Sequence, residues 1–208
     1  CMTLDYFDAL YQDNSDPWHY QTRWYEKRKR AVTLAVLPQA SYSTAVELGC
    51  SNGVFSHEIA PLCEQLLCLD GNAQAVDLAK QRLQYSSHVH VQQANLPQDL
   101  PEGATNGKKF DLIVIGEILY YLSTIEIHAV IDWVKRALTP TGTLVCCHWR
   151  YVIEGFEQNG ETVHTLLQGA LNRPDSEFFE QVQLADADFL LGVWQKGHHS
   201  VAAMEGLI

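Results

Sequence analysis

The sequence predicts an α/β fold in which helices cover both faces of a mostly parallel sheet with an antiparallel C-terminal edge. Three observations predict this fold. Short apolar runs alternate with segments of helical spacing, and glycines and an acidic residue follow the first two runs. After Arg150 the alternation gives way to one helix and two consecutive strand-like runs.

Each predicted strand is a short apolar run bounded by turn residues. Five runs would form the parallel part of the sheet: Ala45–Leu48, Leu66–Asp70, Val89–Gln92, Phe110–Gly116 and Thr143–Cys147. Helical spacing separates them at Val54–Leu62, Ala73–Gln84 and Ile125–Leu138, and residues 139–142 are expected to end the last helix as a turn. The antiparallel edge would follow as a helix near Glu161–Leu171 and strands around Glu177–Leu184 and Asp188–Gln195.

Composition limits the classes of partner. The 208 residues are 47% hydrophobic and 19% charged, which is enough apolar material for one domain with a large core. The formal net charge of -11 disfavours nucleic acid and anionic lipid as partners. No apolar run approaches the roughly 20 residues of a membrane span, and no segment resembles a signal peptide. A cytoplasmic protein is therefore expected.

We expect three parts along the chain: an N-terminal aromatic and helical cap over the ligand site at residues 2–40, a core at 41–196 and a tail at 197–208. The cap crowds seven aromatic residues into twenty positions: Tyr6, Phe7, Tyr11, Trp18, Tyr20, Trp24 and Tyr25. That density of aromatic residues suggests that the segment covers another part of the protein. Cys1 precedes Met2 and is expected to be an addition ahead of the native start. The cysteines lack metal-ligand spacing, so we expect reduced, structural thiols and no metal site.

The residues that follow the first two strands indicate a ligand site, because such sites form at the carboxyl ends of parallel strands. Gly49 and Gly53 permit a tight turn after the first strand, and the amides of the next helix face any electron-rich ligand. Asp70 ends the second strand, where a carboxylate accepts hydrogen bonds from both ribose hydroxyls. The alternative is that these glycines only form turns and Asp70 caps a helix.

The pattern Glu47, Gly49, Ser51, Gly53 resembles the first motif of class I S-adenosylmethionine (SAM) dependent methyltransferases, with Ser51 in place of the central glycine. An NAD-dependent dehydrogenase is the alternative, although its fingerprint has different glycine spacing and no acid at the first position. Closer still, the chain resembles the nodulation protein S (NodS) group of small bacterial methyltransferases. The matching stretches are YFDALYQDNSDPW, WYEKRK, VELGCSNGVFS, FDLIVIGEILYYL and GETV.

This resemblance implies a Rossmann-like sheet of seven strands, SAM as methyl donor with S-adenosylhomocysteine (SAH) as product, and N-methylation of an aminosugar in a chitin oligosaccharide. It implies that Glu47 and the backbone of 49–53 hold the methionine end, Asp70 the ribose, and Asn95 and Leu96 the adenine. Asn95 is alternatively a turn residue. The expected cofactor-binding residues are Trp18, Arg28, Glu47, Gly49, Cys50, Ser51, Gly53, Asp70, Gly71, Asn72, Asn95, Leu96 and Glu117.

Residues 20–37 are expected to form a helix of the cap. A helical projection places Arg28 in the middle of its apolar face and turns Lys29 and Arg30 toward solvent. A buried guanidinium needs an anionic partner, because an unpaired buried charge is costly. Two partners fit, the carboxylate of SAM and Glu47, and the choice stays open.

Methyl transfer requires alignment of donor and acceptor and a deprotonated acceptor atom. The candidate bases are His148, which follows the fifth strand, His164 on the next helix, and Glu117; either histidine is alternatively a hydrogen-bonded strut, and Glu117 a helix cap. Expected substrate contacts are Tyr20, Tyr120, Tyr121, Trp149 and Arg150.

The function predicted from the sequence is SAM-dependent methyl transfer to a small hydrophilic or saccharide acceptor, in the first place an amine. The sequence leaves the oligomeric state open. It also leaves three alternatives: an O-methyltransferase acting on a carbohydrate or small molecule, an NAD-dependent dehydrogenase, and a SAM-binding module without catalysis.

Overall fold

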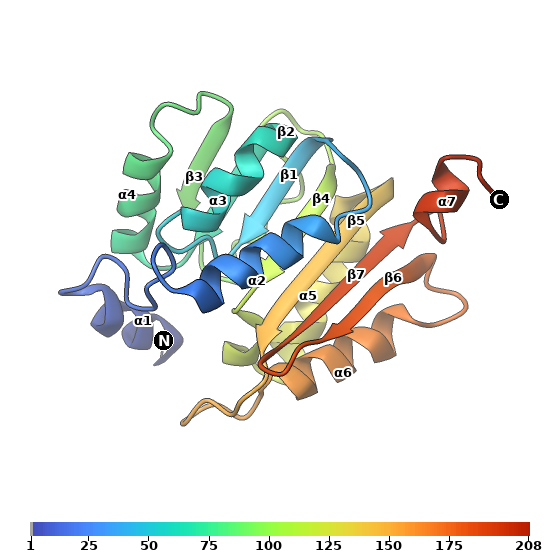
Figure 1. Ribbon diagram of the computed structural model, residues 1–208. Coiled ribbons are helices and arrows are strands. Elements are labelled where there is room, and N and C mark those ends of the chain that lie inside the picture. Colours follow the sequence, from blue (N-terminus) through green and yellow to red (C-terminus); the bar gives the residue numbers. More distant parts are fainter. Residues whose placement is uncertain (1) are drawn as a thin grey trace.

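The computed structural model describes residues 2–208, so Cys1 lies outside the described residues. Its strands are β1 (Tyr42–Leu48), β2 (Cys63–Asp70), β3 (Val89–Gln93), β4 (Phe110–Gly116), β5 (Leu138–Trp149), β6 (Phe178–Ala185) and β7 (Phe189–Lys196). They form one sheet in the order β3-β2-β1-β4-β5-β7-β6 (Figure 1). Strands β1 to β5 are parallel, and β7 pairs antiparallel with β5 and β6. The predicted fold class is confirmed.

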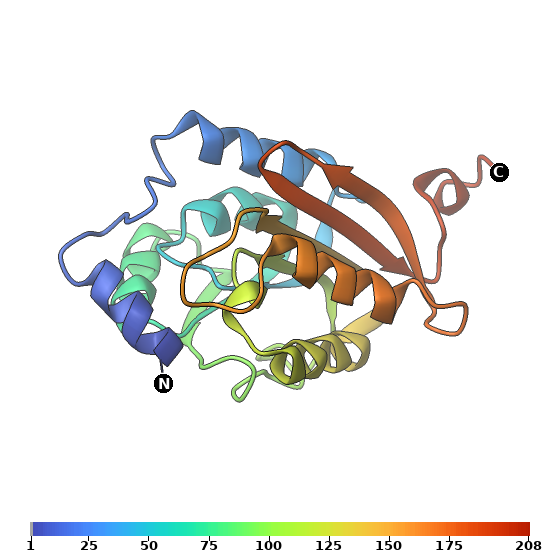
Figure 2. The same ribbon diagram turned by 90° about the horizontal axis from the view of Figure 1, so that it is seen from below.

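Helices cover both faces of this sheet (Figure 2). On one face lie α2 (Trp24–Ala35), α3 (Val54–Ile59), η1 (Ala60–Leu62) and α4 (Ala73–Arg82); on the other lie α5 (Thr124–Ala137) and α6 (Gly160–Leu171). Successive strand residues point to opposite faces, so Ala45 of β1 packs in one apolar cluster and Val46 in the other. The remaining helices are α1 (Met2–Tyr11), η2 (Leu119–Tyr121) and α7 (Val201–Met204).

Local signals explain where the helices begin. Helix α5 starts with a capping box in which Ser123 accepts from the Glu126 amide and Glu126 accepts from the Ser123 amide. Gly53 precedes α3 with a φ of 83°, and a Cβ there would lie 3.1 Å from the Cα of Ala79 in α4. A glycine therefore serves both the left-handed turn and the close packing of α3 on α4.

The structure differs from the predicted elements in four places. The turn expected at 139–142 belongs to β5, which begins at Leu138 because Leu138 already pairs with Phe110 of β4 across an irregularity in the register. The cap helix begins at Trp24 and ends at Ala35, and α1 and α7 are additional helices.

None of the helices within residues 2–208 has the length and the apolar character that a membrane span requires.

Candidate active site

A cavity of about 780 Å³ lies at the carboxyl ends of β1, β2 and β4, within the size range of cofactor and substrate pockets. Its aromatic lining consists of Tyr6, Phe7, Tyr11, Trp18, Tyr20, Tyr25, Tyr120, Tyr121 and Trp149. Its charged lining consists of the acids Glu26, Asp70, Asp99, Glu117, Glu126 and Asp188 and the bases Arg23 and Lys29. Because acids outnumber bases, the site favours a cationic ligand.

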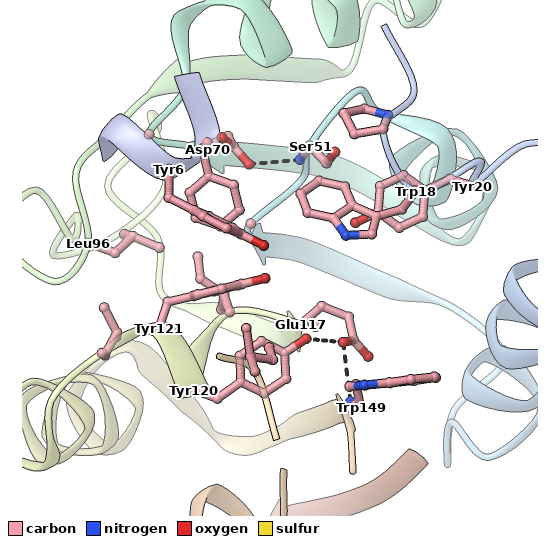
Figure 3. A pocket seen from close by; sticks show the side chains of 18 of the residues that line it. Tyr6, Trp18, Tyr20, Ser51, Asp70, Leu96, Glu117, Tyr120, Tyr121 and Trp149 are labelled. Atoms are coloured by element: carbon pink, nitrogen blue, oxygen red, sulfur yellow. Dashed lines mark hydrogen bonds between the residues drawn. The ribbon is translucent and has the colours of Figure 1, made fainter. Parts of the chain in front are cut away.

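Asp70 and Ser51 form one wall of the cavity (Figure 3). The Asp70 carboxylate accepts the Ser51 amide at 2.9 Å on Oδ2 and the Asn72 amide at 2.9 Å on Oδ1. Burial raises the pKa of Asp70, while the amides that donate to it lower that pKa. Each oxygen keeps a lone pair, so the carboxylate is fixed in place and can still accept hydroxyl protons.

Glu117 forms the opposite wall (Figure 3). Its Oε2 accepts from the Tyr120 hydroxyl and from the Trp149 amide at 3.2 Å, and Lys29 Nζ donates to Oε1 at 3.3 Å. Glu117 has a φ of 57°, a left-handed backbone that is uncommon outside glycine and that turns the chain sharply after β4. Three donors and a tight turn thus hold one carboxylate at the cavity surface.

The N-terminal segment supplies much of the aromatic lining. The Tyr11 hydroxyl is hydrogen-bonded to the Ser51 hydroxyl, and Phe7 packs edge-on against Tyr121 with ring centroids 4.8 Å apart. The rings of Trp18 and Tyr20 lie in contact in a tilted arrangement, with centroids 5.7 Å apart. Helix α1 and the chain that follows it therefore lie against the cavity at both the Asp70 wall and the η2 side.

The structure overturns the placement of His148 and His164 beside the acceptor. Both side chains are buried and neither lines the cavity. His148 Nε2 accepts the Leu119 amide at 3.3 Å, and its Nδ1 lies 3.0 Å from His164 Nε2. Burial lowers the pKa of each histidine to about 3. They form a neutral strut beneath Tyr120, so neither can take a proton from a molecule in the cavity.

The prediction for Arg28 is also wrong, because α2 turns its charged face inward. Trp24 is 73% exposed and Arg28 pairs at 2.5 Å with Asp186, outside the cavity. Lys29 and Arg30, expected in solvent, are buried. Lys29 pairs with Glu117, and Arg30 pairs with Glu58 of α3. These ion pairs make the burial favourable, since buried charges are stable when paired.

The other predicted residues divide between the cavity and the surrounding structure. The cavity is lined by Trp18, Tyr20, Gly49, Ser51, Asp70, Gly71, Asn95, Leu96, Glu117, Tyr120, Tyr121 and Trp149. Arg150 lies outside its lining, paired with Glu161 at 2.7 Å. Asn72 caps α4, Gly53 precedes α3, and Glu47 and Cys50 line a smaller neighbouring cavity.

Sequence reasoning missed Glu26 and Lys29, which line both cavities. Their spacing of three residues on a helix was the available signal, since such a pair lies on one helix face. Tyr6, Phe7 and Tyr11 were noticed as part of an aromatic cluster and were not assigned to the site.

The described residues fit SAM. Asp70 offers fixed acceptors for a ribose, Ala94, Leu96 and Ile118 offer apolar contacts for a purine, and acids surround the space for a sulfonium. The side chain of Leu4 from α1 packs directly on Gly71 at the end of the second strand. No described residues form a cluster able to hold a metal ion.

Comparisons with known proteins identify relatives over most of the chain. The family model of nodulation protein S (NodS) matches residues 8–182. Nodulation protein S of Bradyrhizobium diazoefficiens is 32% identical over 167 residues, which cover 76% of this chain and 75% of that protein. The match to nodulation protein S of Rhizobium tropici is 31% identical, and it covers 66% of this chain and 60% of that protein.

Two solved structures extend the likeness. The crystal structure of the N-methyltransferase NodS from Bradyrhizobium japonicum WM9 in complex with SAH has a TM-score of 0.78 at 30% identity, covering 94% of this chain and 99% of that one. A Pseudomonas syringae structure, described as an inferred methyltransferase, has a TM-score of 0.70 at 40% identity over 84% of this chain and 100% of that one.

Fold, cavity and relatives together define a SAM-dependent methyltransferase. Within that class, the chain belongs to the NodS family. This assignment decides between the transferase and the dehydrogenase interpretations, and it confirms SAM as the donor.

Proposed function

We propose that this protein N-methylates a small hydrophilic amine, with an aminosugar unit of a chitin oligosaccharide as the leading acceptor. The observation that carries the proposal is the Glu117 carboxylate, held by three donors at the surface of an acidic, aromatic cavity. A carboxylate in that position attracts a protonated amine and can accept its proton as the amine becomes nucleophilic.

On the donor side, Asp70 would hold the ribose, Asn95 and Leu96 would flank the adenine, and the ring faces of Trp18 and Tyr20 would lie near the sulfonium. SAM itself supplies an electrophilic methyl group. The chain aligns that methyl with the acceptor and excludes water, and such alignment supplies much of the rate in a direct transfer.

The lining of the cavity favours an amine over a hydroxyl acceptor. Aliphatic hydroxyls are very weak acids and need a base in the transition state, and the buried histidines are out of reach. None of the described residues that line the cavity is a histidine, and Lys29 is paired with Glu26 and Glu117, which leaves carboxylates as the ionised proton acceptors. An amine needs less help, because it becomes nucleophilic on loss of its proton to Glu117 or water.

The relatives support a nitrogen acceptor, and the cavity offers surfaces that suit a sugar. One solved relative is titled an N-methyltransferase NodS, and the aromatic residues Tyr25 and Trp149, packed edge-on at 5.3 Å, offer flat apolar faces beside Glu117. Such faces suit the apolar side of a pyranose ring, whereas neighbouring carboxylates suit its hydroxyl and amino groups.

The test compares methyl transfer from SAM to chitotetraose that carries one free amine at its non-reducing end with transfer to fully N-acetylated chitotetraose, measured by mass spectrometry. We expect transfer to the free amine alone. Glu117→Gln should lower kcat with the amine by roughly 10²-fold while SAH still binds. Glu154→Gln, on the loop after β5 and outside the cavity lining, is the matched control.

Transfer to a hydroxyl group of either oligosaccharide would contradict the amine proposal and favour the O-methyltransferase. SAH binding without transfer to either oligosaccharide or to a panel of small amines would contradict it as well. An unchanged kcat in Glu117→Gln would leave alignment as the source of the rate and remove Glu117 from its role.

A further inference from the structure

A second, smaller cavity of about 70 Å³ adjoins the main one, and the two share Glu26, Lys29, Gly49 and Glu117 in their linings. It lies between α2 and the loop after β1, the end of the site that the resemblance assigns to the methionine portion of SAM. Its volume exceeds that of a single water molecule, so a small polar group fits inside.

A buried acceptor without a donor and a buried carboxylate line this small cavity. Asn52 is 1% exposed, and within residues 2–208 its Oδ1 accepts no hydrogen bond; Glu26 is 7% exposed and has Lys29 as the ion-pair partner of its Oε2. Lys29 Nζ lies 3.0 Å from Glu26 Oε2 as an ion pair and 3.3 Å from Glu117 Oε1. A buried acceptor without a donor is costly, and a single ammonium group shared by two carboxylates leaves one negative charge unbalanced, so the arrangement favours a cationic ligand that donates hydrogen bonds.

Glu47, the acid that the resemblance assigns to this role, is committed elsewhere. It is buried, and its Oε1 accepts the hydroxyl of Ser56 in α3. Burial raises the pKa of Glu47 to about 8, and the bond from Ser56 lowers it only in part. Near pH 7 its carboxyl group is therefore largely protonated and is a poor partner for an ammonium ion.

We propose that Glu26 of α2 receives the α-ammonium group of SAM, in the small cavity beside the loop after β1. Asn52 Oδ1 is a second acceptor for that ammonium, and Lys29 holds the Glu26 carboxylate in place through its Oε2. The three charged groups Glu26, Lys29 and Glu117 carry one net negative charge, which a bound ammonium neutralises. This assignment rests on SAM as the donor and is independent of the acceptor.

Two ligands that differ only at the amino-acid end test the assignment by calorimetry on the full-length protein. SAH carries the α-ammonium, and 5′-methylthioadenosine lacks the whole amino-acid portion. We expect Glu26→Gln to weaken SAH binding roughly 10- to 100-fold, as for loss of a charge-assisted hydrogen bond, and to leave methylthioadenosine binding within twofold.

Three variants complete the experiment. Glu58→Gln, which removes a partly exposed carboxylate facing the same helix, is the matched control and should change neither affinity. Glu47 also lines the small cavity, but its Oε1 is held by Ser56, so Glu47→Gln should weaken SAH binding less than Glu26→Gln does. Asp70→Asn should weaken both ligands by an equal factor, because both carry the ribose.

The outcomes separate the proposal from the proposed function. If Glu26→Gln weakens both ligands equally or neither, the ammonium assignment is wrong. If Glu47→Gln weakens SAH binding selectively and more than Glu26→Gln does, Glu47 and not Glu26 binds the α-ammonium group. Failure of the wild-type protein to bind either ligand would instead contradict the donor site as a whole, whatever Glu26 does.

Discussion

At the scale of single residues, His148 and His164, predicted as catalytic bases, have a structural role. His148 accepts the amide of Leu119 at the start of η2, which carries Tyr120 to the Glu117 wall. His164 holds the other ring nitrogen of His148 at 3.0 Å. The neutral pair therefore supports the site from below, and protonation of either ring would disrupt the hydrogen bonds of the pair.

The histidine pair should make stability depend on pH. Each folded histidine has a pKa of about 3, against 6.5 when unfolded, so the unfolded state binds more protons as pH falls below about 7. Each histidine should therefore lower the free energy of unfolding by about 1.4 kcal/mol between pH 7.5 and pH 5.5. Below pH 3 both states are protonated and the loss is complete.

Glu47 acts in the opposite direction and conceals this effect in the wild-type protein. Its pKa is raised to about 8, so the folded state binds more protons than the unfolded state, and stability rises as pH falls through the same range. The measurement is therefore urea unfolding of His164→Gln and wild type at pH 7.5 and 5.5. Acidification should destabilise the variant less, by about 1.4 kcal/mol; equal losses would exclude the pair as a titrating unit.

At the scale of elements, α1 and the chain to Arg23 supply part of the aromatic lining of the cavity, and we expect them to act as a cover over it. Side chains attach this segment: Tyr11 contacts Ser51, Tyr6 and Phe7 pack on Tyr121, Asn52 donates to the Ser15 carbonyl, and Asn72 donates to Asp8. Contacts of this kind depend on what fills the cavity, because ring faces gain a partner when a ligand enters.

We expect SAH to slow tryptic cleavage after Arg23, an exposed residue between this cover and α2. Cleavage after Lys109, exposed at the opposite end of β4, should proceed at the same rate with and without SAH. Deletion of residues 1–20 should weaken SAH binding at least tenfold while the far-ultraviolet circular dichroism of the core persists. Equal protection at both sites would mean that SAH stabilises the whole protein and that the segment is no separate cover.

Helix α2 shows why part of the site was beyond sequence analysis. A projection of its sequence identifies an apolar face around Trp24 and Arg28, yet that face is the exposed one. The buried face carries Glu26, Lys29 and Arg30, whose partners Glu117 and Glu58 lie 88 and 28 residues away in the chain. Helical periodicity ranks faces by hydropathy, and here long-range ion pairing outweighs hydropathy.

At the scale of the whole molecule, the sheet and its order of elements were predictable because buried parallel strands are continuous apolar runs. Phe110–Gly116 was placed to the residue, and Asp70 and Gly49 were correctly placed at the strand ends that meet at the cavity. The sequence could not predict whether His148 reaches the cavity. His148 lies within β5, and the pleat of the sheet turns its side chain toward His164 of α6. A position near the end of a strand predicts the edge of the sheet at which a residue lies. The packing of neighbouring elements decides whether its side chain points into the cavity.

The overall charge gives a prediction about how the donor reaches the site. The chain carries a formal net charge of -11, and acids dominate the lining of the cavity. SAM is a cation because of its sulfonium, whereas SAH has no net charge, so the field of the protein should attract SAM alone. Stopped-flow quenching of tryptophan fluorescence should show SAM association slowing about threefold between 20 mM and 500 mM NaCl, because the added salt screens the field, with SAH association nearly constant. Equal salt dependence for the two ligands would show that the acids of the cavity hold the sulfonium only after contact and do not steer its approach.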